Sequence, residues 1–267
     1  MKSKAVAFPY LAWMAIFVIV PLGMIVYFAF TNSEGNFSFD SILSIIQYGP
    51  TFVKSLWLAL IATFICLLMA YPMAYMLSRS SLAVQKTMTM LVMLPMWMNF
   101  LLRIYAWRSL LEKGGLLSSL LSVFGFEGSL AGNSGAVILG MVYNFFPFML
   151  LPLYTVMTKI DNSVIEAAED LGSNTYNVFR KVVVPLSIPG IISGITMVFV
   201  PAASTFLISQ YLGGSDNMLI GDIIEKEFLR DKHVGSALSL ILMIIMFIFI
   251  GIMNKVSDDD NMEGMII

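Results

Sequence analysis

The sequence predicts an all-α membrane protein with six transmembrane helices, and its composition, apolar segments and charge balance carry that prediction. Hydrophobic residues make up 58% of the 267 residues and charged residues 12%, whereas soluble domains contain roughly 45–50% apolar and about 25% charged residues. Six segments are apolar over the ~20 residues that a helix needs to cross a bilayer core. Because 15 basic residues stand against 17 acidic ones, the charge balance argues against a nucleic-acid-binding surface.

The six predicted helices leave little chain outside the membrane, so we interpret residues 1–267 as a single transmembrane domain. The helices cover Ala5–Phe30, Leu56–Leu77, Lys86–Leu111, Ala136–Thr158, Ile188–Tyr211 and Ser236–Met253. The first follows Lys2 and Lys4 as a signal peptide would, but it is too long for the apolar part of one and lacks a small-residue cleavage motif. We therefore expect it to be retained as a span.

Proline interrupts five of the six predicted helices, which indicates kinks beside a cavity or ordinary packing irregularities. The positions are Pro21, Pro72, Pro95, Pro147, Pro152 and Pro201. Proline removes a backbone donor, and in lipid the disturbed turn must be satisfied by neighbouring helices, side chains or water. Gly190 and Gly194 have the GxxxG spacing that permits close helix approach. The single cysteine, Cys66, is interpreted as a buried packing residue.

The distribution of basic residues favours both chain termini on the cytoplasmic side. Eight of the fifteen basic residues then lie in cytoplasmic segments, as the positive-inside rule requires. The outer loops cover Thr31–Ser55, Glu112–Gly135 and Leu212–Gly235, the large cytoplasmic loop covers 159–187, and a short acidic cytoplasmic tail covers 256–267. The one histidine, His233, falls in an outer loop and is interpreted as a surface residue.

The cytoplasmic loop between the fourth and fifth helices predicts a short amphipathic helix. Ser163 and Glu166 have the spacing of a capping box, and Gly172 supplies a helix stop. The apolar stripe between them, at positions i, i+3, i+4 and i+7, consists of Val164, Ala167, Ala168 and Leu171. Because alanine side chains are small, such a helix can seat deeply in a groove of another protein.

This loop resembles the EAA loop, of pattern E-A-A-x3-G-x9-I-x-L-P, found in membrane permease subunits of bacterial ABC importers. The matching residues are Glu166, Ala167, Ala168, Gly172 and Pro185, with Val182 and Val184 where the family usually has Ile and Leu. The resemblance implies a type I importer permease fold in the bacterial inner membrane. It also implies that the loop is a coupling helix, and that Glu166, Ala167, Ala168 and Gly172 contact a cytoplasmic ATPase.

The resemblance further implies a complex with a second homologous permease, two ATPase subunits and a periplasmic substrate-binding protein. ATP and Mg would be bound by the ATPase subunits, and we expect no cofactor in this chain. The segments Pro95–Leu111 and Met141–Met157 resemble the spermidine/putrescine branch of the family, which implies a polyamine substrate. Permeases for iron or an inorganic anion share the architecture, so these substrates are the alternative.

A cationic substrate would have to pass without a carboxylate inside the spans, since no Asp or Glu lies well within any of them. Aromatic faces and amide or hydroxyl oxygens can hold an ammonium group instead. The candidates for the substrate path are Trp97, Asn99, Tyr105, Tyr143, Asn144 and Ser204. We expect Pro201 to break the fifth helix beside this path. Arg103 and Arg108 would either repel a polyamine, which keeps the anion alternative open, or pair with the acidic outer loop.

An enzyme is not expected from this sequence. It contains no H-E-x-x-H, G-x-S-x-G or G-x-x-x-x-G-K-[ST] motif. Without the last of these, ATP would have to be hydrolysed by another chain. A secondary transporter or a channel is the rival from a different class, although the sequence shows neither an internal repeat nor the intramembrane carboxylate that is common in such transporters.

Overall fold

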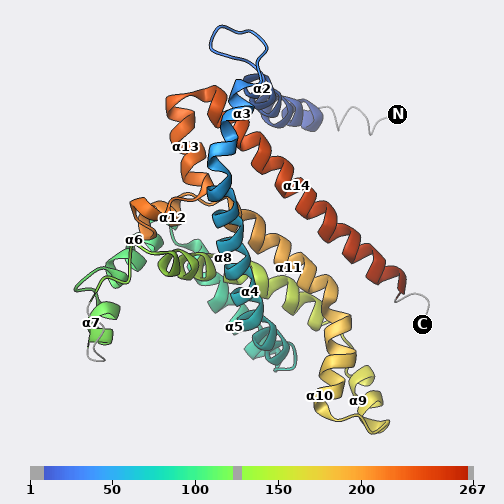
Figure 1. The fold of residues 1–267 in the computed structure, drawn as a ribbon. Helices are drawn as coiled ribbons and strands as arrows, with labels where there is room; N and C mark the ends of the chain where they lie inside the picture. Colours follow the sequence, from blue (N-terminus) through green and yellow to red (C-terminus); the bar gives the residue numbers. More distant parts are fainter. Residues whose placement is uncertain (1–8, 123–127, 264–267) are drawn as a thin grey trace.

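The computed structural model describes residues 9–122 and 128–263, and nearly all of them are helical (Figure 1). In chain order the elements are η1 (Ala15–Ile19), α2 (Val20–Ala29), α3 (Asp40–Leu43), η2 (Ser44–Tyr48), α4 (Gly49–Ser78), α5 (Leu82–Met93), η3 (Leu94–Trp97), α6 (Phe100–Leu111), α7 (Leu116–Ser122), α8 (Ser134–Met157), α9 (Asn162–Asp170), α10 (Thr175–Val178), η4 (Phe179–Val183), α11 (Val184–Ser204), α12 (Leu207–Leu212), η5 (Ser215–Asn217), α13 (Ile220–Arg230) and α14 (Lys232–Glu263). Within these residues five helices are long and apolar enough to cross a membrane, and a bent pair makes up to six. The predicted all-α membrane class is confirmed. Residues 5–8 and 264–267, which belong to the predicted first helix and tail, lie outside the described ranges.

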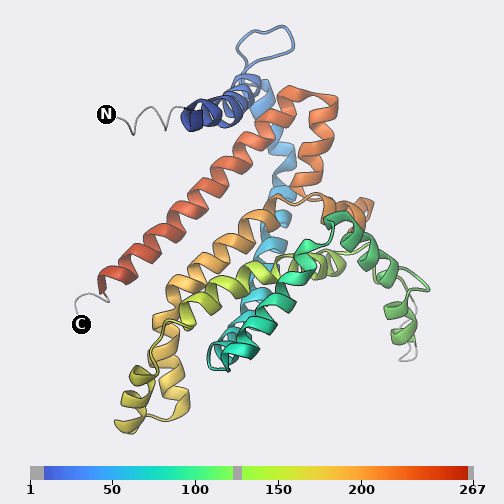
Figure 2. The ribbon, with the colours of Figure 1, turned by 180° about the vertical axis from the view of Figure 1, so that it is seen from behind.

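The centre of the bundle is formed by α4, α8 and α11, which pack along one another (Figures 1 and 2). The face of α4 toward its neighbours consists of small, fully buried side chains. They are Ala59, Ala62, Cys66, Ala70 and Ala74, each with 0% exposure. Small side chains let helix backbones approach closely, which is how membrane helices gain packing energy where lipid offers no hydrophobic drive. The interpretation of Cys66 as a buried packing residue is confirmed.

The GxxxG pair lies where α11 crosses α8. A Cβ atom on Gly194 would lie 2.6 Å from Met149 Sδ, and one on Gly190 would lie 3.1 Å from the Pro152 carbonyl oxygen. These distances are shorter than an ordinary van der Waals contact, and Met149 is itself fully buried. The two glycines therefore allow α11 to approach α8 closely, and any larger residue would push the two helices apart.

The first helix stands outside the bundle and joins it at its carboxyl end (Figure 1). There the Lys232 ammonium lies 4.5 Å from the centroid of the Phe28 ring, and His233 Nδ1 lies 3.1 Å from the Phe28 carbonyl oxygen. His233 is only 7% exposed, so its interpretation as a surface residue is wrong. The start of α14 encloses the imidazole against Phe28 and Thr31, and their oxygens replace water as its partners.

The third predicted span is not one straight helix. It consists of Leu82–Trp97 and Phe100–Leu120, which meet at 91°. Pro95 lies in the 3-10 turn η3 before the break, and Asn99 adopts an extended ψ of 131° and caps α6 by accepting hydrogen bonds from the backbone N–H groups of Leu101 and Leu102. A helix cap at this point ends one helix and starts another, which hydropathy alone does not reveal.

The fifth predicted span ends earlier than expected. The α11 helix continues through Pro201 and ends at Ser204, because Thr205 is extended with ψ 143°. Pro201 was expected to break the helix, and the break lies four residues further on. The chain then forms α12, η5 and α13, so the predicted outer loop Leu212–Gly235 is folded and largely helical. At the other boundaries, α4 begins seven residues before Leu56, and α14 continues beyond Met253 into the predicted tail.

Candidate functional site

The loop between the fourth and fifth predicted spans forms a helix, as predicted, but its cap differs. The helix α9 begins at Asn162, and Asp161 caps it by accepting a hydrogen bond from Ser163 N–H at 3.0 Å. The expected capping box of Ser163 and Glu166 is therefore wrong, because the chain turns into the helix two residues earlier. The hydrogen bonds from Ser163 lower the pKa of the exposed Asp161 carboxyl, and Glu166 remains exposed on the helix surface.

The helix stop at Gly172 is confirmed. Gly172 has a φ of +83°, its N–H donates to the Glu169 carbonyl at 2.8 Å, and the N–H of Ser173 donates to the Ala168 carbonyl at 3.1 Å. This pair of bonds is the Schellman arrangement, in which a left-handed residue satisfies the last helical carbonyls. Gly172 thus directs the chain away from α9 toward α10.

Three residues at the end of α4 hold this loop. The Phe179 ring packs edge-on against Tyr71 and Tyr75, with centroid distances of 5.5 Å and 5.6 Å. Arg79 Nη1 donates to the Ile160 carbonyl at 3.2 Å and also to the Asn162 side chain. A displacement of α9 would therefore be passed directly to a helix of the central bundle.

Tyr143 lines a mostly apolar cavity that is separate from the cavities beside Trp97 and Ser204. The cavity is about 570 Å³ and is lined by Trp107, Tyr143, Pro95 and Pro147 among others, and the Trp107 and Tyr143 rings meet edge-on at 5.2 Å. Asn144 is instead buried at 2% exposure. Its Nδ2 donates to the Gly140 carbonyl at 2.8 Å, while its Oδ1 has no partner among the described residues.

The other candidates have separate surroundings. Asn99 caps α6, Trp97 is 75% exposed beside a different cavity, and the Tyr105 ring contacts the Tyr211 ring at 4.9 Å. Ser204 donates to the Val200 carbonyl at 3.0 Å and lines a cavity of about 520 Å³ together with Glu225. Within this chain, the six predicted path residues therefore do not converge on one site.

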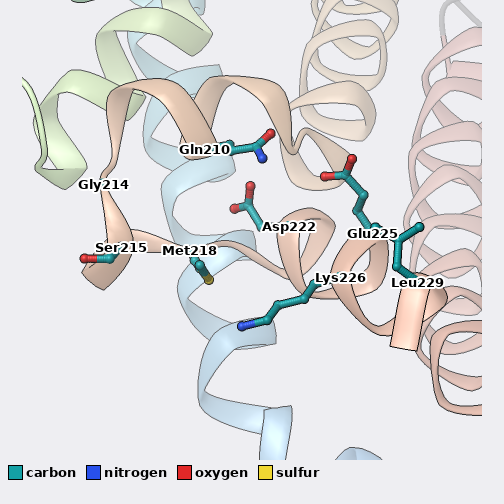
Figure 3. A pocket seen from close by; sticks show the side chains of 8 residues that line it. All are labelled: Gln210, Gly214, Ser215, Met218, Asp222, Glu225, Lys226 and Leu229. Atoms are coloured by element: carbon teal, nitrogen blue, oxygen red, sulfur yellow. The ribbon is translucent and has the colours of Figure 1, made fainter. Parts of the chain in front are cut away.

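A further cavity, of about 310 Å³, lies between α12 and α13, and sequence reasoning missed it (Figure 3). Gln210, Asp222, Glu225 and Lys226 line it. Asp222 is only 7% exposed, although the sequence placed it in an outer loop. Burial raises the pKa of this carboxyl and the nearby Glu225 adds to the rise, while the nearby Ser209 hydroxyl and a hydrogen bond from the Leu219 backbone oppose it. The sequence does contain one signal for this site. Asp222 is an acidic residue in the first turn of a short amphipathic segment that follows Gly213 and Gly214.

Metal binding has no support in the part of the chain that the structure describes, where no three His, Cys, Asp or Glu side chains gather as metal ligands would.

Two ion pairs in the described residues join Arg108 to Glu112 at 3.2 Å and Arg230 to Glu227 at 3.9 Å. Arg108, which was expected either to repel a polyamine or to pair with the acidic outer loop, has taken the second course. Such an exposed pair contributes little to stability.

The fold is that of known importer permeases. A crystal structure of a bacterial ABC transporter that imports the acidic polysaccharide alginate superposes with a TM-score of 0.76 at 16% identity, covering 96% of this chain and 94% of that one. The same kind of transporter in complex with an alginate pentasaccharide-bound periplasmic protein gives a TM-score of 0.75 at 16% identity, with 95% and 93% covered.

Sequence similarity is closer and extends over most of the chain. The spermidine/putrescine transport system permease protein PotB of Haemophilus influenzae is 36% identical over 252 residues, 90% of this chain and 88% of that protein. PotB of Escherichia coli is 36% identical over 247 residues, 88% and 90% respectively. The inner membrane ABC transporter permease protein YdcU of E. coli is 28% identical over 78% of this chain and 72% of that protein. The model of the family described as binding-protein-dependent transport system inner membrane component matches residues 5–259. This chain therefore belongs to the binding-protein-dependent transport system inner membrane components, the non-catalytic membrane permeases of bacterial ABC importers.

Proposed function

We propose that this chain provides the membrane path of an ATP-driven importer for polyamines of the spermidine/putrescine class. The observation that carries the proposal is the 36% identity to the PotB permeases over about nine-tenths of the chain. A periplasmic binding protein delivers the substrate, in keeping with the binding-protein dependence of the family. Iron and inorganic anions are the competing substrates, and competition for uptake in reconstituted vesicles separates them.

The partner at the cytoplasmic end is an ATPase. The α9 helix lies at one extremity of the molecule (Figure 1), and its apolar stripe is not covered by the described chain, since Leu171 is 88% exposed and Val164 is 44% exposed. An exposed apolar stripe on an otherwise acidic helix fits a groove of another protein. Glu166, Ala167, Ala168 and Gly172 form the contact in this proposal. ATP and Mg bind to that ATPase, which occurs twice in the complex.

A second homologous permease completes the path. The first helix buries only Ala29 of its residues from Pro9 to Ala29, so its apolar surface is left for lipid or another subunit. The apolar cavity beside Tyr143 is likewise open on one side. The candidate path residues of this chain do not meet, so the chain alone does not form a complete path. A partner permease that packs on this face would bring the two halves of a path together.

Both termini are cytoplasmic in this proposal, on the same side as α9. Cys66→Ala protein provides a cysteine-free background, and single cysteines are introduced into it at positions 4 and 255. In vesicles whose periplasmic face is outside, these cysteines should react with a membrane-impermeant maleimide only after the membrane is permeabilised. A cysteine at position 114, in a predicted outer loop, is the matched control and should show the opposite accessibility. Labelling of position 4 together with position 114 would refute the topology.

The test of the substrate uses the whole complex. An affinity tag on this chain isolates it with its associated subunits, which are identified by mass and reconstituted into vesicles with the binding protein and with Mg·ATP on the ATPase side. We expect ATP-dependent uptake of labelled spermidine and putrescine that unlabelled polyamines compete away, whereas sulfate, molybdate and ferric ions do not. ATP-driven uptake of one of those ions would refute the polyamine proposal. Uptake that follows an ion gradient without ATP would indicate a secondary transporter or a channel.

A further inference from the structure

The cavity between α12 and α13 is rigidly built. Ile220 N–H donates to Ser55 Oγ of α4 at 2.7 Å, and Ile220 is fully buried. A Cβ atom on Gly221 would lie 2.5 Å from the Thr205 carbonyl oxygen and 2.8 Å from that of Ser204. The start of α13 is therefore held directly against the end of α11, at the point where the fifth predicted span breaks.

This anchoring places a carboxylate inside the protein. Asp222 Oδ2 accepts a hydrogen bond from Leu219 N–H at 2.6 Å. One of the two carboxyl oxygens therefore has a structural role, because it caps the start of α13. Asp222 Oδ1 is buried and has no hydrogen-bond partner in the residues that the structure places. A buried carboxyl oxygen without a hydrogen-bond partner is costly, so this atom calls for one.

The cavity carries an excess of negative charge and of acceptors. Figure 3 shows the Gln210 amide and the Asp222 and Glu225 carboxyl groups in the upper part of the view, with the Lys226 side chain below them. The two ion pairs of the described chain include neither Asp222 nor Glu225 nor Lys226. A primary ammonium brings three N–H donors and a positive charge, which match this arrangement in number and in sign.

We propose that this cavity is a subsite for one terminal ammonium group of the substrate, with Asp222 Oδ1 as the buried acceptor and Glu225 and Gln210 at its opening. The subsite rests on the proposed polyamine function and names where the chain holds the cation. It supplies from a folded outer segment the carboxylate that the membrane spans lack.

Glu225 connects this subsite to the predicted path. It lines both the cavity with Asp222 and the neighbouring cavity of about 520 Å³ that contains Ser204 and Phe206. An ammonium held at Asp222 can therefore move to the side of Ser204 while it remains next to a carboxylate. Of the six predicted path residues, Ser204 is the one that this arrangement uses.

The test compares carboxamide variants in the reconstituted complex with its binding protein. Asp222→Asn should raise the KM for spermidine about tenfold and Glu225→Gln about threefold. Glu227→Gln is the matched control on the same helix, because Glu227 is buried and accepts from the Tyr48 hydroxyl instead of lining the cavity. Its KM should equal that of the wild type.

A second readout separates ammonium binding from a structural role. A monoacetylated spermidine lacks one terminal ammonium, so the wild-type complex should prefer spermidine over it, and Asp222→Asn should lose most of this preference. An unchanged KM and an unchanged preference would overturn the subsite while wild-type spermidine uptake leaves the polyamine function standing. If Asp222→Asn prevents assembly, the exposed Glu225→Gln decides, and an unchanged KM there overturns the subsite. Absence of polyamine uptake by the wild type would refute both proposals.

Discussion

Replacement of Gly172 by valine should uncouple transport from ATP turnover, and the structure gives the size of the effect. Gly172 has a φ of +83°, and a Cβ atom built on it would meet nothing within 4 Å. The substitution therefore produces no collision, and its cost is the left-handed backbone, roughly 1–2 kcal/mol for a residue with a Cβ atom. An energy of this size changes the population of the native turn by a factor of about 5–30.

Asparagine at the same position separates backbone strain from loss of glycine itself. Asn tolerates the left-handed region far better than a β-branched residue does, so Gly172→Asn should keep most of the coupled transport. Gly114→Val is the matched control, because Gly114 has a φ of +85° and equally open surroundings but lies in a predicted outer loop.

The assay measures spermidine uptake and ATP hydrolysis in the same reconstituted vesicles. For Gly172→Val we expect ATP hydrolysis to continue with several-fold less spermidine imported per ATP, because α9 no longer leads into α10 at the required angle. Gly114→Val should retain the wild-type ratio. Wild-type coupling in Gly172→Val, or equal losses in the valine and asparagine variants, would refute the role of the left-handed turn in coupling.

The remaining predictions address packing, the path, the absence of a nucleotide site and pH. Gly194→Val should lower the stability of the detergent-solubilised complex by about 1–3 kcal/mol, since its side chain would overlap Met149; thermal unfolding should show no such loss for Gly251→Val, where a Cβ atom meets nothing within 4 Å. Tyr143→Ala should reduce polyamine uptake with assembly and basal ATPase activity intact, because it removes from the cavity lining an aromatic face that can hold an ammonium group at ~0.5–2 kcal/mol; full uptake would remove Tyr143 from the path. The purified chain alone should show no cross-linking to a photoreactive ATP analogue, because it has no phosphate-binding glycine loop, and specific labelling would contradict this. Because burial raises the pKa of Asp222, its carboxyl ionises only as the pH rises above the usual carboxyl range, so the KM for spermidine should fall with rising pH over that interval. Asp222→Asn should abolish this dependence, and a dependence that persists in the variant would assign it to other groups near the cavity, such as Glu225, Lys226 or Tyr211.

Local sequence features determined the membrane class, the approximate spans and the short helix α9. A span depends on the hydropathy of consecutive residues, and the turn at Gly172 depends on one residue that can adopt a positive φ. The alanine stripe of α9 follows from helical periodicity alone. Each of these features is fixed by neighbours in the chain, so the sequence reveals them without knowledge of the fold.

Tertiary contacts decided the features that the sequence did not reveal. Asp161 in place of Ser163 caps α9, and Asn99 ends one helix and starts another, because the entry angles of these segments are set by packing. Asp222 is buried because the N–H of Ile220, at the start of α13, donates a hydrogen bond to Ser55, which lies 165 residues before Ile220 in the sequence. His233 is buried for a similar reason, since its ring nitrogen meets the Phe28 carbonyl 205 residues away. Hydropathy assigns polar residues to the surface, whereas burial depends on whether distant segments bring partners that replace water.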